Sequence, residues 1–268
     1  MRNVGRVDQP SYEACFRAQI GALTADAQNR LRQATVLIVG AGGLGVAVSS
    51  VLAGVGVGTL IVADPQYLEA GDFNRYIFAR ASDVGKSKVD ALASFFEGRP
   101  HLTVVPILAC AETDVVRRAA EHADVLLATS NTISSRTALA TLAVRRRKAH
   151  VAAALHDGRE RAGGTITIWT PAVPGLACAG CFLRNDGVPA RGEALVAPVV
   201  ATVGALAADA VVRLITADAD EAVRAGNYLA IDLDERLVEP MTVLRRPDCV
   251  VCGPAAGAAS LKPSESGR

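Results

Sequence analysis

The chain has 268 residues, of which 50% are apolar, and a formal net charge of +1. This length suits one large α/β domain or two small ones, and that much apolar sequence can bury a sizeable core. A net charge near zero gives no general electrostatic reason to bind nucleic acid or an anionic membrane, so neither is expected as a partner.

The start of the chain lacks the pattern of a secretory signal. Residues 1–10 carry Arg2, Arg6 and Asp8 and have no apolar core, which a signal peptide requires. Residues 33–63 carry no charge, and a stretch of that length could span a bilayer. Glycines divide it into shorter pieces, however, and a buried parallel strand is also continuously apolar. We therefore expect a cytoplasmic protein.

Apolar periodicity predicts alternating strands and helices up to residue 155. Thr24 is a suitable N-cap for a helix over residues 25–33. The elements expected next are strand 35–39, helix 43–54, strand 59–63, a polar loop over 64–80, helix 86–97, strand 101–108, helix 113–121, strand 124–128, helix 135–148 and strand 150–155. This alternation is typical of a doubly wound, mostly parallel sheet in the α/β class.

The pattern changes after residue 155. Residues 165–169 alternate with period two, which predicts an antiparallel strand. The elements expected after it are a Gly-, Pro- and Ala-rich loop over 171–192, a long apolar helix over 195–215 and short strands over 227–232 and 238–244. We expect an N-terminal arm over 1–22, a single domain over 23–252 and a disordered tail over 253–268.

The sequence Val-Gly-Ala-Gly-Gly-Leu-Gly connects the first expected strand to the next helix. Gly40, Gly42 and Gly45 have the spacing of a phosphate-binding turn, whose N–H groups can hold phosphates at the helix start. Gly43 lies where a side chain would collide with the nucleotide. Asp64, at the end of the second strand, can accept hydrogen bonds from ribose hydroxyls. The turn alone does not distinguish ATP from NAD or FAD.

Four of the six cysteines form two C-x2-C pairs, Cys178 with Cys181 and Cys249 with Cys252. Together they supply the four soft thiolates that tetrahedral Zn²⁺ prefers. The alternatives are a redox dithiol and unligated thiols. A redox motif needs one pair and usually opens a helix, whereas both pairs here lie in loops. We expect a structural zinc site with no position open to a substrate.

The order of these motifs resembles the ThiF/MoeB/HesA family, which is related to ubiquitin-activating enzymes. The glycine turn, Asp64, Asn74-Arg75, Lys88 and the two cysteine pairs follow one another with the family's spacing. The resemblance implies a Rossmann-like sheet, usually a homodimer, that binds ATP with Mg²⁺. It also implies that a carboxylate attacks the α-phosphate, that an acyl-adenylate forms and that pyrophosphate leaves. The carboxylate would be the C-terminal glycine of a small ubiquitin-like or sulfur-carrier protein, or a small carboxylic acid.

Two cations favour ATP over NAD. Displacement at phosphorus spreads negative charge over phosphate oxygens, and fixed cations stabilise that charge. Arg75 would be the bidentate partner and Lys88 the point charge. The alternatives are a surface ion pair and a solvated lysine, and Lys86 competes with Lys88 for the role. Arg17 resembles the family's arginine that reaches into the ATP site of the partner subunit.

The resemblance therefore implies three sets of site residues. Catalytic roles fall to Arg17, Arg75 and Lys88. Nucleotide binding falls to Gly40, Gly42, Gly43, Gly45, Asp64, Asp72, Asn74, Arg75, Lys88, Ser130 and Asn131. Structural zinc is expected at Cys178, Cys181, Cys249 and Cys252.

The loop after the fourth parallel strand departs from the family. Ser130 stands where the family has an aspartate that holds Mg²⁺, and a neutral hydroxyl holds this hard cation less well. The arginine that follows is one residue late, at Arg136. One hypothesis is that Asp72 or Asp157 replaces the missing ligand. The other is a catalytically impaired relative that binds a partner.

Residues 182–194 contain no cysteine. Relatives that form a thioester or persulfide usually carry one there, so we expect the chemistry to stop at the adenylate. An NAD-dependent oxidoreductase is a third hypothesis, but it leaves Arg75, Lys88 and the cysteine pairs unexplained. Cys15 and Cys110 are expected to be buried as small apolar side chains.

Overall fold

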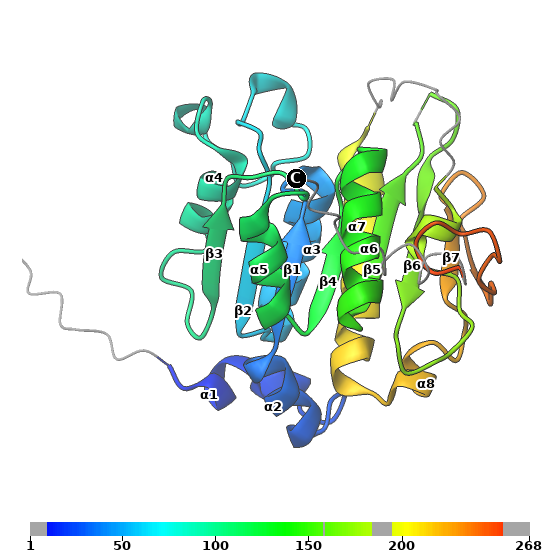
Figure 1. The fold of residues 1–268 in the computed structure, drawn as a ribbon. Coiled ribbons are helices and arrows are strands. Elements are labelled where there is room, and N and C mark those ends of the chain that lie inside the picture. Colours follow the sequence, from blue (N-terminus) through cyan, green and yellow to red (C-terminus); the bar gives the residue numbers. More distant parts are fainter. Residues whose placement is uncertain (1–9, 158, 184–194, 254–268) are drawn as a thin grey trace, which may run out of the picture.

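The computed structural model describes residues 10–157, 159–183 and 195–253 (Figure 1). In this part of the chain, eight strands form one sheet in the order β3-β2-β1-β4-β5-β6-β7-β8. The strands are β1 (Thr35–Val39), β2 (Thr59–Ala63), β3 (Thr103–Ile107), β4 (Val125–Ala128), β5 (Ala149–Leu155), β6 (Gly163–Trp169), β7 (Tyr228–Asp232) and β8 (Leu237–Met241). Strands β1 to β5 are parallel, and β6, β7 and β8 continue the sheet antiparallel. Both features of the expected fold class are confirmed.

Helices cover both faces of the parallel part of the sheet. The α-helices of the described residues are α1 (Tyr12–Phe16), α2 (Ala25–Gln33), α3 (Gly43–Val55), α4 (Lys88–Phe95), α5 (Asp114–His122), α6 (Ile133–Arg146), α7 (Ala197–Thr216) and α8 (Ala219–Ala222). Helices α5 and α6 lie on one face, and α3 and α7 lie on the other (Figure 1). The expected tail lies outside the described residues from residue 254 onward, as do residues 184–194 of the expected loop.

Burial on two faces explains why the strands are apolar throughout. In β1, Val36 and Ile38 pack into the core under α3 and α7. Leu37 and Val39 point the other way, into the core under α5 and α6. A half-exposed strand would alternate instead, so the continuous apolar run of β1 is the consequence of two covered faces.

Helix α7 is a core helix, although its length and apolar composition would also suit a membrane span. It lies along α3, and its buried side chains belong to the core between α3 and the sheet. At Gly204 a Cβ would come within 2.6 Å of the Ala47 Cβ. The absence of a side chain at Gly204 therefore lets the two helices approach closely.

The two edge strands share one feature. Strand β3 contains Pro106 and β8 contains Pro240, and both residues are exposed. Proline has no N–H group, so it cannot donate to a neighbouring strand and is found in sheets mainly at edges. The positions of these prolines agree with the ends of the strand order.

The N-terminal residues pack beside the far end of α3. The buried Tyr12 hydroxyl donates to the Gly56 carbonyl, which follows α3, at 2.7 Å. The side-chain amide of Gln19 donates to the Val55 carbonyl at 3.3 Å. Arg17 begins the short 3-10 helix that follows α1. This part of the expected arm, residues 12–19, therefore lies at the opposite end of α3 from the glycine turn.

Candidate active site

A cavity of about 300 Å³ lies at the carboxyl ends of the parallel strands. Its lining comes from the glycine turn after β1, from the segments after β2, β3 and β4, and from the start of α6. Strand order reverses between β1 and β4, and ligands of open α/β sheets bind at such a point. The predicted nucleotide residues that line the cavity are Gly40, Gly42, Gly43, Asp64, Arg75, Lys88, Ser130 and Asn131.

The glycine turn fits closely against its surroundings. Gly40 has φ +112°, and a Cβ there would lie 2.6 Å from the Ser130 nitrogen, so this position requires glycine. At Gly45 a Cβ would lie 1.9 Å from the Gly40 carbonyl oxygen. The Thr129 hydroxyl donates to that same oxygen at 2.7 Å. The turn is therefore fixed between α3 and the loop after β4, and the first residues of α3 line the cavity.

Arg75 occupies the space that a side chain at Gly43 would need. A Cβ at Gly43 would lie 2.7 Å from Cγ and Cδ of Arg75 and 2.9 Å from its Cβ. The stem of Arg75 therefore passes directly over the first residue of α3. This close contact holds the arginine beside the positive end of the helix.

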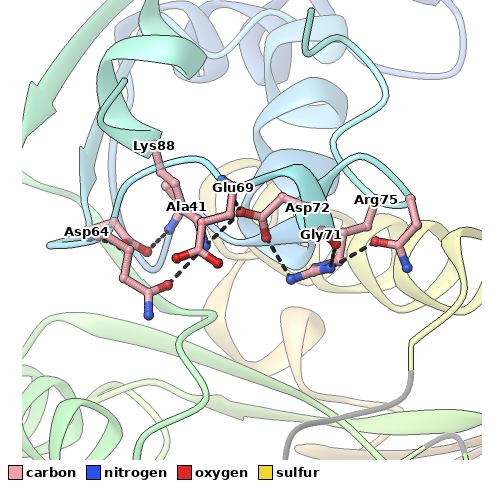
Figure 2. Close-up of polar contacts among 9 residues, drawn as sticks. Ala41, Asp64, Glu69, Gly71, Asp72, Arg75 and Lys88 are labelled. Atoms are coloured by element: carbon pink, nitrogen blue, oxygen red, sulfur yellow. Dashed lines mark hydrogen bonds and ion pairs between the residues drawn. The ribbon is translucent and has the colours of Figure 1, made fainter. Parts of the chain in front are cut away.

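Asp64 braces the turn from the end of β2. Its Oδ2 accepts the Ala41 N–H at 2.7 Å, and its Oδ1 accepts the Gln66 N–H at 2.7 Å (Figure 2). The side chain is buried, yet it lines the cavity. Asp64 thus orients the turn and presents its carboxylate to whatever occupies the adjoining space.

Asp72 joins the two predicted cations in one cluster. Its Oδ1 lies 2.7 Å from Nη2 of Arg75, and its Oδ2 lies 3.4 Å from Nζ of Lys88 (Figure 2). Oδ2 also accepts the Glu69 N–H at 3.0 Å. Nζ of Lys88 donates to Oε1 of Gln66 at 3.0 Å. Both oxygens of Asp72 are therefore engaged, and the residue lies behind the cations that line the cavity.

The burial of this cluster fixes its geometry. The side chains of Asp72 and Lys88 are 5% and 8% exposed, whereas that of Arg75 is 25% exposed. Breaking a buried ion pair by removing one partner destabilises a protein by roughly 3–5 kcal/mol. The Lys88 ammonium is therefore strongly favoured to stay beside Asp72. Helix α4 begins at Lys88, two residues later than expected, because the Ser87 hydroxyl caps it by accepting the Asp90 N–H at 3.1 Å.

Tyr76 packs under the same cluster and is 1% exposed. Burial raises the pKa of Tyr76 far above its usual value, and the carboxylates of Asp64 and Asp72 raise it further. The phenol is therefore neutral throughout the ordinary pH range. Its hydroxyl has no hydrogen-bond partner among the residues that the structure describes.

The loop after β4 meets the start of α6 at the cavity. The Ser130 hydroxyl donates to Oγ of Ser135 at 2.9 Å. Nε of Arg136 donates to the Ser130 carbonyl at 2.7 Å, and Nη2 donates to the Ala153 carbonyl at 2.8 Å. Arg136, one residue late against the family pattern, therefore still anchors this loop.

The two proposed replacements for the magnesium ligand lie elsewhere. Asp72 is occupied by Arg75 and Lys88, as described above. Asp157 lies outside the cavity lining and binds Arg159 through both carboxylate oxygens. Beside it, burial lowers the pKa of the half-buried His156, and Arg161 lowers it further. Neither acid is placed to supply oxygen ligands beside Ser130.

Two more predicted residues lie away from the lining. Asn74 donates from Nδ2 to the Leu195 carbonyl at 2.9 Å and accepts from Nη1 of Arg75 at 2.8 Å, so it orients the arginine. Arg17 lies at the far end of α3 from the turn. A helix of 13 residues is about 20 Å long, so Arg17 does not reach the cavity of its own chain.

Gln66 is a site residue that the sequence analysis did not identify. It contacts the Lys88 ammonium through its side chain and Asp64 through its N–H group. The available signal was its position two residues after Asp64, because the segment that follows β2 borders the site in this fold class. Polar residues are common in such loops, however, so the signal is weak.

The four paired cysteines lie together. The ligand atoms of Cys178, Cys181, Cys249 and Cys252 are all within 4.8 Å of one another. The Sγ atoms of Cys178 and Cys249 are 3.8 Å apart, and those of Cys181 and Cys252 are 3.5 Å apart. Tetrahedral Zn²⁺ with bonds of 2.3 Å would hold sulfur atoms about 3.8 Å apart. The donor set and its spacing fit a structural zinc ion.

Backbone groups support this cluster. The Arg246 N–H points to Sγ of Cys181 at 3.5 Å, and the Val251 N–H points to Sγ of Cys249 at 3.4 Å. Hydrogen bonds from the other thiols, with that from Arg246, hold the pKa of Cys181 far below its usual range. The short helix Ala179–Cys181, which carries this pair, packs against α6. The cluster thus joins two distant loops to the helix that borders the cavity.

Replacing Cys249 with serine is expected to abolish zinc binding. The purified protein should contain one zinc per chain by elemental analysis, and the variant should contain little. Loss of a closed four-thiolate site should lower the melting temperature substantially, because metal binding contributes directly to folding. Cys15→Ser is the matched control and should leave both measurements unchanged. A wild-type protein purified without any metal would contradict the assignment.

The other two cysteines are exposed, so the expectation that they are buried was wrong. Helix α1 is only five residues long and buries Tyr12 and Phe16 on one face, which leaves Cys15 on the outside. Cys110 lies in the segment between β3 and α5, where it lines the cavity. Burial was predicted from residue type alone. Cys15 is exposed because it lies on the outer face of α1, and Cys110 is exposed because it lines the cavity.

Comparison with known proteins places this site in a family. A model of the ThiF family matches residues 16–251. The adenylyltransferase and sulfurtransferase Uba4 of Aspergillus clavatus is 30% identical over 85% of this chain and 49% of its own, so the chain spans about half its length. The molybdopterin-synthase adenylyltransferase of Salmonella typhimurium is 28% identical over 85% of this chain and 90% of its own. The crystal structure of Escherichia coli MccB with ATP has a TM-score of 0.69 at 22% identity, over 85% of this chain and 69% of its own, which is a likeness of fold. The family match covers most of the sequence, and the chain belongs to the ThiF family.

Proposed function

We propose that this chain adenylates a carboxylate at the expense of ATP. A carboxylate oxygen attacks the α-phosphorus and forms a new P–O bond. The bond from that phosphorus to the β-bridging oxygen breaks, and pyrophosphate leaves with the electron pair. The observation that carries the proposal is the cluster in which Asp72 holds Arg75 and Lys88 beside the glycine turn.

Adenylation requires mainly fixed positive charge around the phosphate groups. The phosphate oxygens gain negative charge in the transition state, and donors that are already in place stabilise it without reorganisation. Lys88 is buried and fixed by two partners. Arg75 is held by Asp72 and Asn74. The N–H groups that begin α3 add a third source of positive charge at the turn.

The substrate that we propose is the C-terminal glycine of a small ubiquitin-like or sulfur-carrier protein, or a small carboxylic acid. Relatives with adenylyltransferase in their names support the reaction class. Residues 182–194 contain no cysteine, so the acyl-adenylate would pass to an external nucleophile instead of a thiol in that segment. ATP, Mg²⁺ and structural zinc are the cofactors of this proposal.

A homodimer in the cytoplasm completes the proposal. Arg17 lies about one helix length from its own cavity, so it could serve only the site of a second copy. Reduced cysteines, which the zinc cluster requires, are normal in the cytoplasm.

ATP–pyrophosphate exchange tests the reaction. Labelled pyrophosphate should enter ATP when a matching carboxylate is present, so a panel of peptides ending in Gly-Gly and of small acids is assayed with Mg²⁺ titrated. Arg75→Gln is the matched inactive control. Calorimetry with ATP and with NAD identifies the nucleotide independently of the acyl substrate. Lack of exchange with every carboxylate, together with lack of ATP binding, would refute the proposal.

Ser130 favours one alternative, a member of the family that binds a partner without catalysis. The loop that carries Ser130 borders the phosphate turn, and a hydroxyl is a weaker magnesium ligand than a carboxylate. In that case the protein would bind a carrier protein in a pull-down assay while exchange remained at background. Exchange above the Arg75→Gln background would exclude this alternative.

A further inference from the structure

The cavity is surrounded by positive groups on the side of β1 and β4. It is lined by Gly42, which precedes α3, and by Gly43, the first residue of that helix. It is also lined by Thr132, which precedes α6, and by Ser134 and Ser135 in the first turn of α6. Both helix N-termini therefore open toward one space. The first N–H groups of an α-helix have no partner within the helix, and the positive end of the helix dipole lies there.

Side-chain cations add to these helix ends. Arg75 and Lys88 line the cavity beside α3, and Arg136 lines it beside α6. Arg136 is held rigidly because two of its nitrogens donate to the Ser130 and Ala153 carbonyls. A guanidinium cannot lose its charge in this environment. The loop after β4 is therefore bordered by a permanent positive charge.

The carboxylates lie on the other side. Among the described residues, the acids that line the cavity are Asp64 after β2 and Glu112 after β3. Strand β1 separates β2 from β4, so the ends of β2 and β4 are about 10 Å apart at the usual strand spacing. Both oxygens of Asp64 already accept backbone N–H groups. The side-chain oxygen atoms that could bind a metal ion beside Ser130 belong to neutral hydroxyl and amide groups.

This arrangement suits a phosphate anion and does not suit a magnesium ion. Mg²⁺ demands octahedral oxygen ligands, commonly with one or two carboxylates from the protein. Ser130 offers a neutral hydroxyl oxygen instead of a carboxylate, and the guanidinium of Arg136, whose Nε donates to the Ser130 carbonyl, would repel a cation placed next to it. The residues after β4 therefore do not fit the metal that the family resemblance implies.

We infer that this chain binds the ATP triphosphate through its own cations and helix N-termini and supplies no carboxylate to magnesium, so that ATP binding does not require the metal. The inference rests on the proposed ATP site and concerns which form of the nucleotide that site accepts. A magnesium ion carried by ATP would be held by phosphate oxygens and water.

Calorimetry of ATP binding in EDTA and in excess Mg²⁺ tests the inference. The wild-type Kd in EDTA is expected to be equal to, or lower than, the Kd with Mg²⁺. A Kd that falls tenfold or more when Mg²⁺ is added would overturn it, and Glu112→Gln would then show whether Glu112 is the ligand. Absence of ATP binding in both buffers would instead refute the proposed ATP site.

A substitution at Ser130 should create the metal dependence. Ser130→Asp is expected to raise the Kd for ATP in EDTA about tenfold, because a carboxylate near the phosphates repels them, and Mg²⁺ should restore it. Ser130→Asn is the neutral control of the same size, and its Kd in EDTA should be no higher than its Kd with Mg²⁺, because it adds no charge near the phosphates. Equal Kd values for Ser130→Asp with and without Mg²⁺ would contradict the inference, provided that its melting temperature is unchanged.

Discussion

Lys88→Met is expected to reduce ATP–pyrophosphate exchange by a factor of about 10² to 10³, the usual loss when one fixed donor is removed from a transition state. Methionine keeps the length of the side chain and removes its charge. Asp72 would retain Arg75 and the Glu69 N–H as partners, so the buried carboxylate stays compensated. The effect should therefore appear in kcat, with a much smaller change in the melting temperature.

Lys86 supplies the control for this experiment. It lies two residues before Lys88, but its side chain is 49% exposed and pairs with Asp83 at 2.8 Å. Exposed ion pairs contribute little, so Lys86→Met should leave exchange unchanged. If both variants kept full activity, or if Lys86→Met were the inactive one, the assignment of Lys88 as the fixed point charge would fail.

Mixing two inactive variants is expected to restore exchange. Arg17→Ala removes the arginine that we propose for the partner's site, and Arg75→Ala removes the arginine of the chain's own site. A dimer with one subunit of each kind has one intact site, built from the unchanged Arg75 of one subunit and the unchanged Arg17 of the other. Random exchange of equal amounts should therefore give about a quarter of wild-type activity.

The double variant Arg17→Ala/Arg75→Ala controls for nonspecific rescue. Mixed with either single variant it should give no activity, because each mixture then lacks one of the two arginines completely. Two other results would exclude the proposed role of Arg17. The first is wild-type exchange by Arg17→Ala on its own, and the second is a mixture of the two single variants that stays inactive after mass spectrometry has verified subunit exchange.

Most of the fold could be predicted because the apolar pattern records burial directly. The continuous run of β1 and the period-two strand β6 indicated parallel and antiparallel parts of the sheet, and Thr24 marked the start of α2. Helix α1 was not expected. Its five residues are too few to show a helical period, and it is held by tertiary contacts such as that of Tyr12 with Gly56.

The site was less predictable, since sequence spacing identifies residue types and leaves their partners open. Asp72 and Arg75 are three residues apart, a spacing at which charged side chains can pair, yet the contact of Asp72 with Lys88 needs the fold of the loop between them. The contact of Arg75 with Gly43 joins segments 32 residues apart along the chain. The hydrogen bond from Arg136 to the Ser130 carbonyl depends on where α6 begins, and the sequence motif does not specify that position.

The prolines at the two edges of the sheet restrict how other proteins can associate with it. An edge strand normally offers a row of N–H and C=O groups on which another chain can build a further strand. Pro106 and Pro240 interrupt that row on both sides. We expect visiting proteins, including a second copy, to bind through helices, loops or the sheet face, and we expect the folded protein to resist edge-to-edge aggregation at high concentration.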